Sequence, residues 1–174
     1  TQIGAALGAL GWVAAEWRKT GAPTTLGAAS GAIAGLVAIT PAAGFVGPVA
    51  AFAFGIIAGV ACYYAVSLKF RFGYDDSLDV VGVHLVGGIV GSLLLGLLAQ
   101  EGVGGTDGAL FGNAALIWYQ LVGVVAVLVF SGVVTYVIAR VVEATVGLRA
   151  TDKEEADGLD ISIHEERGYV LDAR

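Results

Sequence analysis

The stretch from Thr20 to Leu68 reads TGAPTTLGAASGAIAGLVAITPAAGFVGPVAAFAFGIIAGVACYYAVSL and contains no Asp, Glu, Lys or Arg. A helix needs about 20 apolar residues to cross the hydrocarbon core of a bilayer, so the stretch is long enough for two crossings. Pro41 and Pro48 stand near its middle, and proline both removes a backbone donor and clashes with the preceding helical turn. The sequence therefore predicts one span at about residues 26–45 and another at about 49–68.

The composition of the whole chain also indicates a lipid environment. The 174 residues are 57% hydrophobic and 14% charged, whereas an average soluble domain is roughly 25% charged. A soluble domain of this size could not bury so much apolar surface. Further spans are expected at about residues 1–17, 80–99 and 114–143. The predicted fold class is therefore an all-α integral membrane protein with five transmembrane helices in this chain.

The basic residues are distributed asymmetrically along these spans. Every Lys and Arg follows the first or third span or follows or ends the fifth, and the loops after the second and fourth carry none. Because positive charge is enriched in cytoplasmic loops, the basic side is expected to be cytoplasmic in a multi-pass protein of the cell membrane. Residues 1–147 are then the transmembrane portion and residues 148–174 a cytoplasmic tail. The net charge of −6 lies largely in this tail, and the lack of a basic face argues against nucleic-acid binding.

Glycines recur four residues apart in several of the expected spans. Small residues at this spacing line one face of a helix and let two backbones approach closely. The pattern is typical of the tightly packed helices of a channel or transporter, and does not decide between them. The glycines concerned are Gly4, Gly8, Gly27, Gly31, Gly35, Gly55, Gly59, Gly87 and Gly91.

His84 is an ionisable residue inside the expected span 80–99. It follows Asp76 by a helical distance on the order of 12 Å, at about 1.5 Å per residue. Ionisable side chains at such depth are costly and usually face a pore or a partner. The simpler alternative is a neutral histidine that makes one interhelical hydrogen bond. A neutral imidazole both donates and accepts a hydrogen bond, which suits the handling of a small polar solute or the relay of a proton.

Other polar residues near these spans have two interpretations each. Asp75, Asp76 and Asp79 flank the start of the helix that carries His84. They either cap that helix or form an acidic vestibule that attracts cations. Ser30 and Thr40 either hydrogen-bond to their own backbone or line a pore.

No pattern in the sequence predicts an enzyme. There is no Ser-His-Asp, Cys-His or paired-carboxylate arrangement placed for catalysis. A single cysteine, Cys62, allows neither a disulfide framework nor a metal-binding spacing. The glycine-rich stretch 102–108 lacks the Lys-Ser/Thr of a phosphate-binding loop. We therefore expect no catalytic residues, no cofactor and no metal.

Two segments resemble motifs of the ammonium transporter family (Amt/Mep/Rh). Residues 27–44, GAASGAIAGLVAITPAAG, resemble its signature, and residues 75–84, DDSLDVVGVH, resemble its DD-x-x-D-x-x-G-V-H segment. Residues 146–149, VGLR, and 158–160, GLD, are similar to its tail. The resemblance covers essentially the whole chain in order. It identifies the chain as the C-terminal part of a family member, comprising helices seven to eleven and the cytoplasmic tail.

The resemblance implies an eleven-helix inverted-repeat channel fold that assembles as a homotrimer with one pore in each subunit. It further implies transport of ammonium or ammonia past two mid-membrane histidines, of which His84 would be the second. Ser30, Ile33, Thr40 and Val80 would line or approach the inner part of the pore. Asp76 and Asp79 would support its cytoplasmic vestibule. Leu85 stands where many members have glycine, which could alter helix packing.

The tail is implied to be regulatory through contact with a PII-type signal-transduction protein. Residues 164–169, HEERGY, resemble a family H-G-E-x-A-Y pattern, with Glu165 in place of the glycine. Composition alone would favour a solvated, disordered end. The residues carried over by the resemblance are Gly158, Leu159, Asp160, His164, Glu166 and Tyr169.

Three functional alternatives follow from the resemblance. The first is a transporter subunit, truncated in this chain and expected to be inactive alone. The second is an ammonium sensor or receptor that uses the same fold, which would carry a signalling domain after the last helix. The short polar segment after Gly147 favours transport. The third is a non-functional gene fragment.

Overall fold

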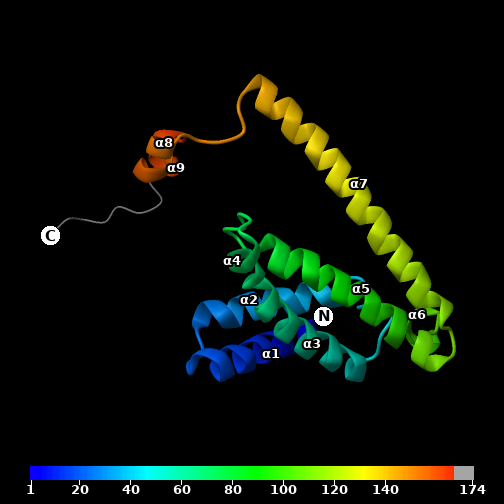
Figure 1. The fold of residues 1–174 in the computed structure, drawn as a ribbon. Helices are drawn as coiled ribbons and strands as arrows, with labels where there is room; N and C mark the ends of the chain where they lie inside the picture. The colour runs from blue at the N-terminus through cyan, green and yellow to red at the C-terminus, as the bar shows by residue number, and fades with distance from the viewer. Residues whose placement is uncertain (167–174) are drawn as a thin grey trace. The chain divides into compact units, whose positions relative to one another are not determined.

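The computed structural model describes residues 1–166, which contain helices and no strand. The chain divides into two compact units, Thr1–Ala126 and Val127–Arg174. The all-α architecture predicted from the sequence is confirmed for the part of the chain that the structure describes. Figure 1 shows the order of its helices.

The first unit is built on α1 (Gln2–Thr20), α2 (Thr25–Ile39) and α3 (Pro48–Val66), which pack side by side (Figure 1). Glycines form the contacts between their backbones. A Cβ atom placed on Gly8 would lie 2.7 Å from the Cα atom of Gly35, and one on Gly59 would lie 2.8 Å from the amide nitrogen of Trp12. The predicted role of the glycine spacing in close helix packing is thus confirmed.

Polar contacts join α1 to α2. Gly21, at φ 85°, ends α1, and a left-handed conformation of this kind suits glycine. The Thr24 hydroxyl caps α2 by accepting a hydrogen bond from the Gly27 amide at 2.9 Å. The Glu16 carboxylate accepts from both the amide and the hydroxyl of Thr24, at 3.1 and 2.9 Å. The end of α1 therefore orients the start of α2.

The α-helix that begins at Thr25 ends at Ile39, earlier than the expected end near residue 45. Residues 40–46 form turns before α3 begins at Pro48. Thr40 keeps helical backbone angles and its amide donates to the Leu36 carbonyl at 3.1 Å. Pro41 then has no amide hydrogen to continue the helical hydrogen bonds. Pro48 stands instead in the first turn of α3, where a missing amide hydrogen costs nothing.

The helix that carries His84 crosses the first unit. After α4 (Leu68–Phe72) and a loop, the π-helical segment η1 (Val80–Leu85) continues directly into α5 (Val86–Leu98). These elements lie against α2 and α3. A Cβ atom on Gly91 would lie 2.7 Å from the Cα atom of Ala38, and one on Gly82 would lie 2.8 Å from that of Val66. Glycines thus also set the distance between this helix and its neighbours.

Short elements connect α5 to the last long helix. They are α6 (Glu101–Gly104) and η2 (Ala109–Phe111), followed by α7 (Ala115–Thr145). Gln100 links this connection to the turn before α3. Its amide donates to the Phe45 carbonyl at 2.9 Å, and its side-chain oxygen accepts from the Gly47 amide at 3.0 Å.

Three stretches among the described helices are long and apolar enough to cross a membrane: Pro48–Phe72, Val80–Leu98 and Ala115–Thr145. The helix Thr25–Ile39 is apolar but shorter, and α1 carries Glu16, Arg18 and Lys19 near its end. All five expected membrane crossings stay predictions.

Candidate functional site

His84 lies in a π-helical segment, which is an uncommon conformation. The segment begins directly after Asp79, which adopts a left-handed conformation at φ 56° and ψ 30°. The Val83 amide donates to the Asp79 carbonyl at 2.8 Å and closes the first turn. π-Helical turns occur mostly as local insertions in α-helices and often at functional sites. The His84 side chain is exposed in this chain.

Asp76 caps this segment. Its Oδ1 accepts a hydrogen bond from the Val80 amide at 2.7 Å, and its Oδ2 accepts from the Val81 and Gly82 amides at 3.0 and 3.3 Å. The first amides of a helix have no partner within the helix, and the helix dipole favours a negative charge there. Asp76 is buried, and its carboxylate satisfies these amides. The capping interpretation therefore describes Asp76, while its part in a vestibule stays a prediction.

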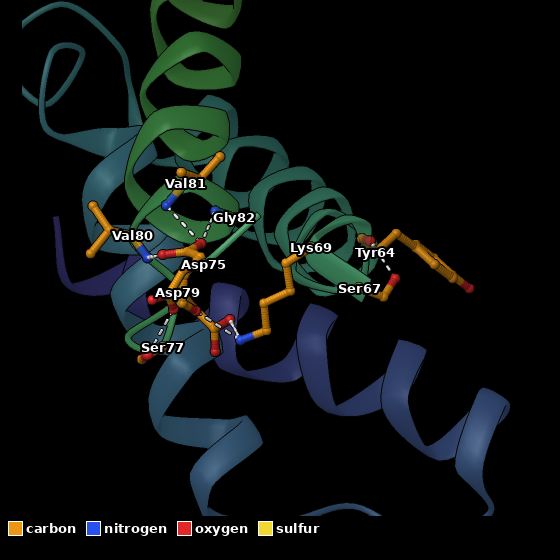
Figure 2. A network of polar contacts seen from close by, with 10 residues as sticks. Tyr64, Ser67, Lys69, Asp75, Ser77, Asp79, Val80, Val81 and Gly82 are labelled. Carbon is orange, nitrogen blue, oxygen red and sulfur yellow. Dashed lines mark hydrogen bonds and ion pairs between the residues drawn. The ribbon is translucent and has the colours of Figure 1, made fainter. Parts of the chain in front are cut away.

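Lys69 completes the polar network (Figure 2). Its Nζ lies 2.6 Å from Asp79 Oδ1 and donates to the Asp76 carbonyl at 2.9 Å. Figure 2 shows its side chain pointing toward Asp79. Sequence reasoning misses Lys69, because no periodic spacing relates it to Asp79 across the loop. The available signal is that two cations, Lys69 and Arg71, precede three nearby carboxylates.

Each of the three carboxylates before His84 has a donor within this chain. Asp75 accepts from the Ser77 hydroxyl at 3.1 Å, Asp76 accepts from the helix amides, and Asp79 accepts from Lys69. Within residues 1–166, no group of three His, Cys, Asp or Glu side chains is arranged to hold a metal ion. These acidic residues therefore organise the loop.

The candidate pore residues of α2 lie away from its packed face. Glycines and alanines of α2 face its neighbours, whereas Ile33 is 45% exposed and Thr40 is also exposed. Ser30, three residues before Ile33, is partly buried. Residues three and seven apart share one side of a helix. The Thr40 hydroxyl donates to the Leu36 carbonyl at 2.6 Å, which is the local bond expected of threonine in an apolar helix.

The structure places the His84 segment beside α2. A Cβ atom on Gly87 would lie 3.2 Å from Val37 Cγ1. Val80, four residues before His84, is 51% exposed. The elements that carry Ser30, Ile33, Thr40, Val80 and His84 are thus neighbours, and most of these side chains are left uncovered by this chain.

Cys62 supports the same segment from α3. Its side chain is fully buried, and its Sγ lies 3.7 Å from the carbonyl oxygen of Val83, the residue before His84. A thiol is a weak donor, and a π-helical turn disturbs the regular carbonyl pairing of an α-helix. The sequence analysis treated Cys62 only as an unpaired cysteine and did not predict this contact.

The tail begins with α8 (Asp152–Asp157), which has a reciprocal cap. The Glu154 amide donates to the Thr151 hydroxyl at 3.3 Å, while the amide and hydroxyl of Thr151 donate to Glu154 Oε2 at 2.7 and 2.8 Å. These two donors, the amide first, lower the pKa of the Glu154 carboxyl because they stabilise its charged form. Arg149 and Glu155 form an exposed ion pair at 3.4 Å, a type that contributes little.

The tail residues carried over by resemblance surround α9 (Leu159–Ser162). Gly158, at φ 93°, separates α8 from α9, which includes Leu159 and Asp160. The Glu166 amide donates to the Asp160 carbonyl at 3.0 Å, and the His164 amide donates to the Leu159 carbonyl at 3.4 Å. Tyr169 lies outside the described residues.

Glu165 adopts φ 56°, a left-handed conformation. It stands where the H-G-E-x-A-Y pattern has glycine, the residue for which this conformation carries no steric cost.

Known proteins resemble this chain over nearly its full length. The family model described as Ammonium Transporter Family matches residues 1–169. This chain belongs to the ammonium transporter family. An ammonium transporter of Bacillus subtilis is 51% identical over 172 residues, covering 97% of this chain and 43% of that protein. One of Aquifex aeolicus is 48% identical over 172 residues, covering 98% of this chain and 40% of that protein.

Solved structures of the ammonium transporter family share the fold. The crystal structure of Saccharomyces cerevisiae Mep2 is 36% identical with a TM-score of 0.81, covering 87% of this chain and 36% of that chain. A structure named Sensor Amt Protein, 24% identical with a TM-score of 0.79, shows the same fold. The chain spans less than half the length of these family members. The predicted family resemblance is confirmed, and the chain is part of a multi-pass membrane protein of a transporter family, not of an enzyme family.

Proposed function

We propose that this chain forms part of a protein that transports ammonium or ammonia across the cell membrane through a histidine-lined pore in each subunit of a homotrimer. One observation carries the proposal. In a chain of the ammonium transporter family, His84 lies uncovered within the candidate span Val80–Leu98. His84 would supply a polar group to the pore. The uncovered side chains of Ile33 and Val80 would supply an apolar wall.

The chemistry of the substrate favours such a wall. Moving an intact ammonium ion into hydrocarbon removes a large solvation energy. Neutral ammonia carries no such cost, and it can pass a narrow apolar passage after a proton is left at the entrance. A neutral imidazole at His84 would accept from and donate to ammonia in turn. Ser30 and Thr40 add hydroxyl groups on the same side of α2.

The cytoplasmic vestibule is proposed to lie at Asp76 and Asp79. Asp76 holds the start of the His84 helix through three amides, and Asp79 is held by Lys69. These residues keep the vestibule in one shape, and their carboxylates make the local potential more negative, which favours a departing or arriving cation.

The tail, residues 148–174, is proposed to be cytoplasmic and to regulate transport by binding a PII-type signal-transduction protein. The turn at Gly158 and the cap at Thr151 support a defined shape for the segment with Leu159 and Asp160. His164, Glu166 and Tyr169 are proposed to belong to the same regulatory site. Capture of the full-length protein by such a partner, and loss of capture after truncation at Gly147, is the expected result. Equal capture of the truncated protein would contradict the tail assignment.

Methylammonium uptake tests transport directly. The full-length protein should be produced in cells that lack their own ammonium transporters, with an empty vector as control. Uptake well above the vector is expected, whereas the 174-residue chain alone is expected to be inactive. The alternative, an ammonium sensor, is considered because a structure named Sensor Amt Protein has this fold. Saturable ammonium binding without uptake would favour the sensor and contradict transport.

A further inference from the structure

Lys69 has a relation to His84 that neither the sequence motifs nor the family assignment describes. We propose that Lys69 is a positioning residue: its ammonium group clamps the turn from Asp76 to Asp79 and thereby fixes the helical register of the segment that carries His84. The inference rests on the proposed pore role of His84. Lys69 would act on the pore through the backbone of the turn, without lining the pore itself.

The clamp has two contacts, both on the same turn. Lys69 Nζ lies 2.6 Å from the Asp79 carboxylate and donates to the Asp76 carbonyl at 2.9 Å. That carbonyl also accepts from the Asp79 amide at 3.2 Å. The Lys69 side chain is 17% exposed and that of Asp79 is 36% exposed. An ion pair that is partly shielded from water and tied to a second acceptor is more effective than a pair on the open surface.

The clamped turn carries the cap of the His84 segment. Asp76 presents its carbonyl to Lys69 and its carboxylate to the amides of Val80, Val81 and Gly82. One residue therefore joins the lysine to the first amides of the π-helical segment. If the turn moves, the carboxylate moves with it, and these amides lose their acceptor.

The turn needs such support because it is strained and negatively charged. Asp79 adopts φ 56°, a conformation in which an L side chain crowds the following carbonyl. Asp75, Asp76 and Asp79 lie within five consecutive residues, so their carboxylates repel one another. Among residues 1–166, Lys69 is the basic side chain that forms an ion pair with them. Removing its charge would leave both the strain and the repulsion unopposed.

A change in the clamped turn would change the orientation of the His84 side chain, because the turn sets the register of the helix that carries it. A π-helical insertion places one extra residue in the helix. A change of one residue in helical register rotates a side chain by about 100° at 3.6 residues per turn. His84 lies within the insertion, at the fifth position of Val80–Leu85. Loss of the clamp therefore lets His84 turn out of alignment with α2.

Hydrogen exchange measures the clamp independently of transport. In the purified full-length protein, Lys69→Gln should speed exchange of the Val80, Val81 and Gly82 amides roughly tenfold, as local opening becomes easier. Lys69→Arg keeps the charge and should retain most of the protection. Arg71→Gln is the matched control, because it removes a cation two residues away that forms no ion pair within residues 1–166. Unchanged exchange in Lys69→Gln would overturn the clamp.

Methylammonium uptake then tests the positioning of His84. At equal membrane abundance, Lys69→Gln should lower the maximal rate roughly tenfold, with Lys69→Arg and Arg71→Gln near the unmodified protein. In hydrogen exchange, the double variant Lys69→Gln with Asp79→Asn should open no faster than Lys69→Gln alone, because the Lys69–Asp79 ion pair is already lost. Faster exchange with unchanged uptake would overturn the positioning role. Absence of uptake in the unmodified protein would contradict the proposed function, and the exchange result alone would then judge the clamp.

Discussion

Two regions of the first unit are held together by different forces. The bundle of α1, α2 and α3 is held by shape, because glycines bring its backbones into contact. The turn and π-helical segment from Asp76 to Leu85 are held by charge and hydrogen bonds to Lys69 and Asp76. Added side-chain atoms would disrupt the packing of the first region, and loss of a charged group would disrupt the hydrogen bonds of the second. The proposed pore residues come from both regions: Ser30, Ile33 and Thr40 from α2 and its end, and Val80 and His84 from the π-helical segment.

The largest expected effect comes from filling the bundle. In Gly8→Leu, the new side chain has no space, since even a Cβ atom would lie 2.7 Å from the Cα atom of Gly35. We expect a loss of at least about 3 kcal/mol of stability, or failure to accumulate, because the backbones must separate. Thermal unfolding of the full-length protein in detergent measures it. Gly123→Leu is the control, because a Cβ atom on Gly123 meets no atom within 4 Å; equal losses in the two variants would argue against the packing account.

A smaller loss is expected from uncapping the polar segment. Asp76→Ala removes the acceptor of three amides, and hydrogen bonds to a charged group contribute about 1.5–3 kcal/mol each where they are not replaced by water. We expect a total loss of about 2–3 kcal/mol in the same unfolding measurement, with lower methylammonium uptake. Asp75→Asn is the matched control because Asp75 contacts only the nearby Ser77 hydroxyl in the described chain. A comparable loss of stability in Asp75→Asn would mean that the total negative charge of the loop, and not the Asp76 cap, stabilises the segment.

The packing of α5 on α2 can be tested with two glycines of α5. A Cβ atom on Gly91 would lie 2.7 Å from the Cα atom of Ala38, whereas one on Gly88 meets no atom within 4 Å. Gly91→Ala should lose about 1–2 kcal/mol of stability, and Gly88→Ala should be neutral or slightly stabilising because alanine favours a helix. Unfolding temperatures that rank the two variants in the opposite order would contradict the packing of α5 on α2.

The smallest effect is expected in the tail, where an exposed cap operates without an apolar core. The hydrogen bonds from Thr151 lower the pKa of Glu154 in the folded tail. A carboxyl with a lowered folded pKa stabilises the fold above its unfolded pKa, and that contribution is lost as the pH falls through the folded value. Amide exchange in residues 151–158 should therefore show a loss of protection in acid. Glu154→Gln should remove this pH dependence, and its persistence would exclude Glu154 as the cause.

Repetitive patterns in the sequence predict the fold best. Glycines four residues apart predicted the close packing that the structure shows at Gly8, Gly35 and Gly59. Uncharged stretches contain most of α3 and α5 and the first part of α7, and that these helices cross a membrane stays a prediction. α2 ends at Ile39, before the expected end near residue 45, because Pro41 interrupts the helix and apolar composition does not show how many turns follow.

The polar network could be predicted only in part. The position of Asp76 before an apolar helix predicts a cap, but no residue pattern predicts the π-helical segment at Val80–Leu85. Lys69 and the thiol of Cys62 act across gaps in the sequence, so their partners depend on tertiary structure. The pore assignments of Ser30, Ile33, Thr40, Val80 and His84 stay predictions.

The central claim is that His84 lies in the conduction pathway, and methylammonium uptake by the full-length protein with His84→Ala tests it most directly. At equal membrane abundance, we predict a clear change in uptake rate or in selectivity among small cations, while Val129→Ala on the exposed surface of α7 leaves both unchanged. Uptake and selectivity indistinguishable from the unmodified protein would show that His84 only packs between helices, and would contradict the account.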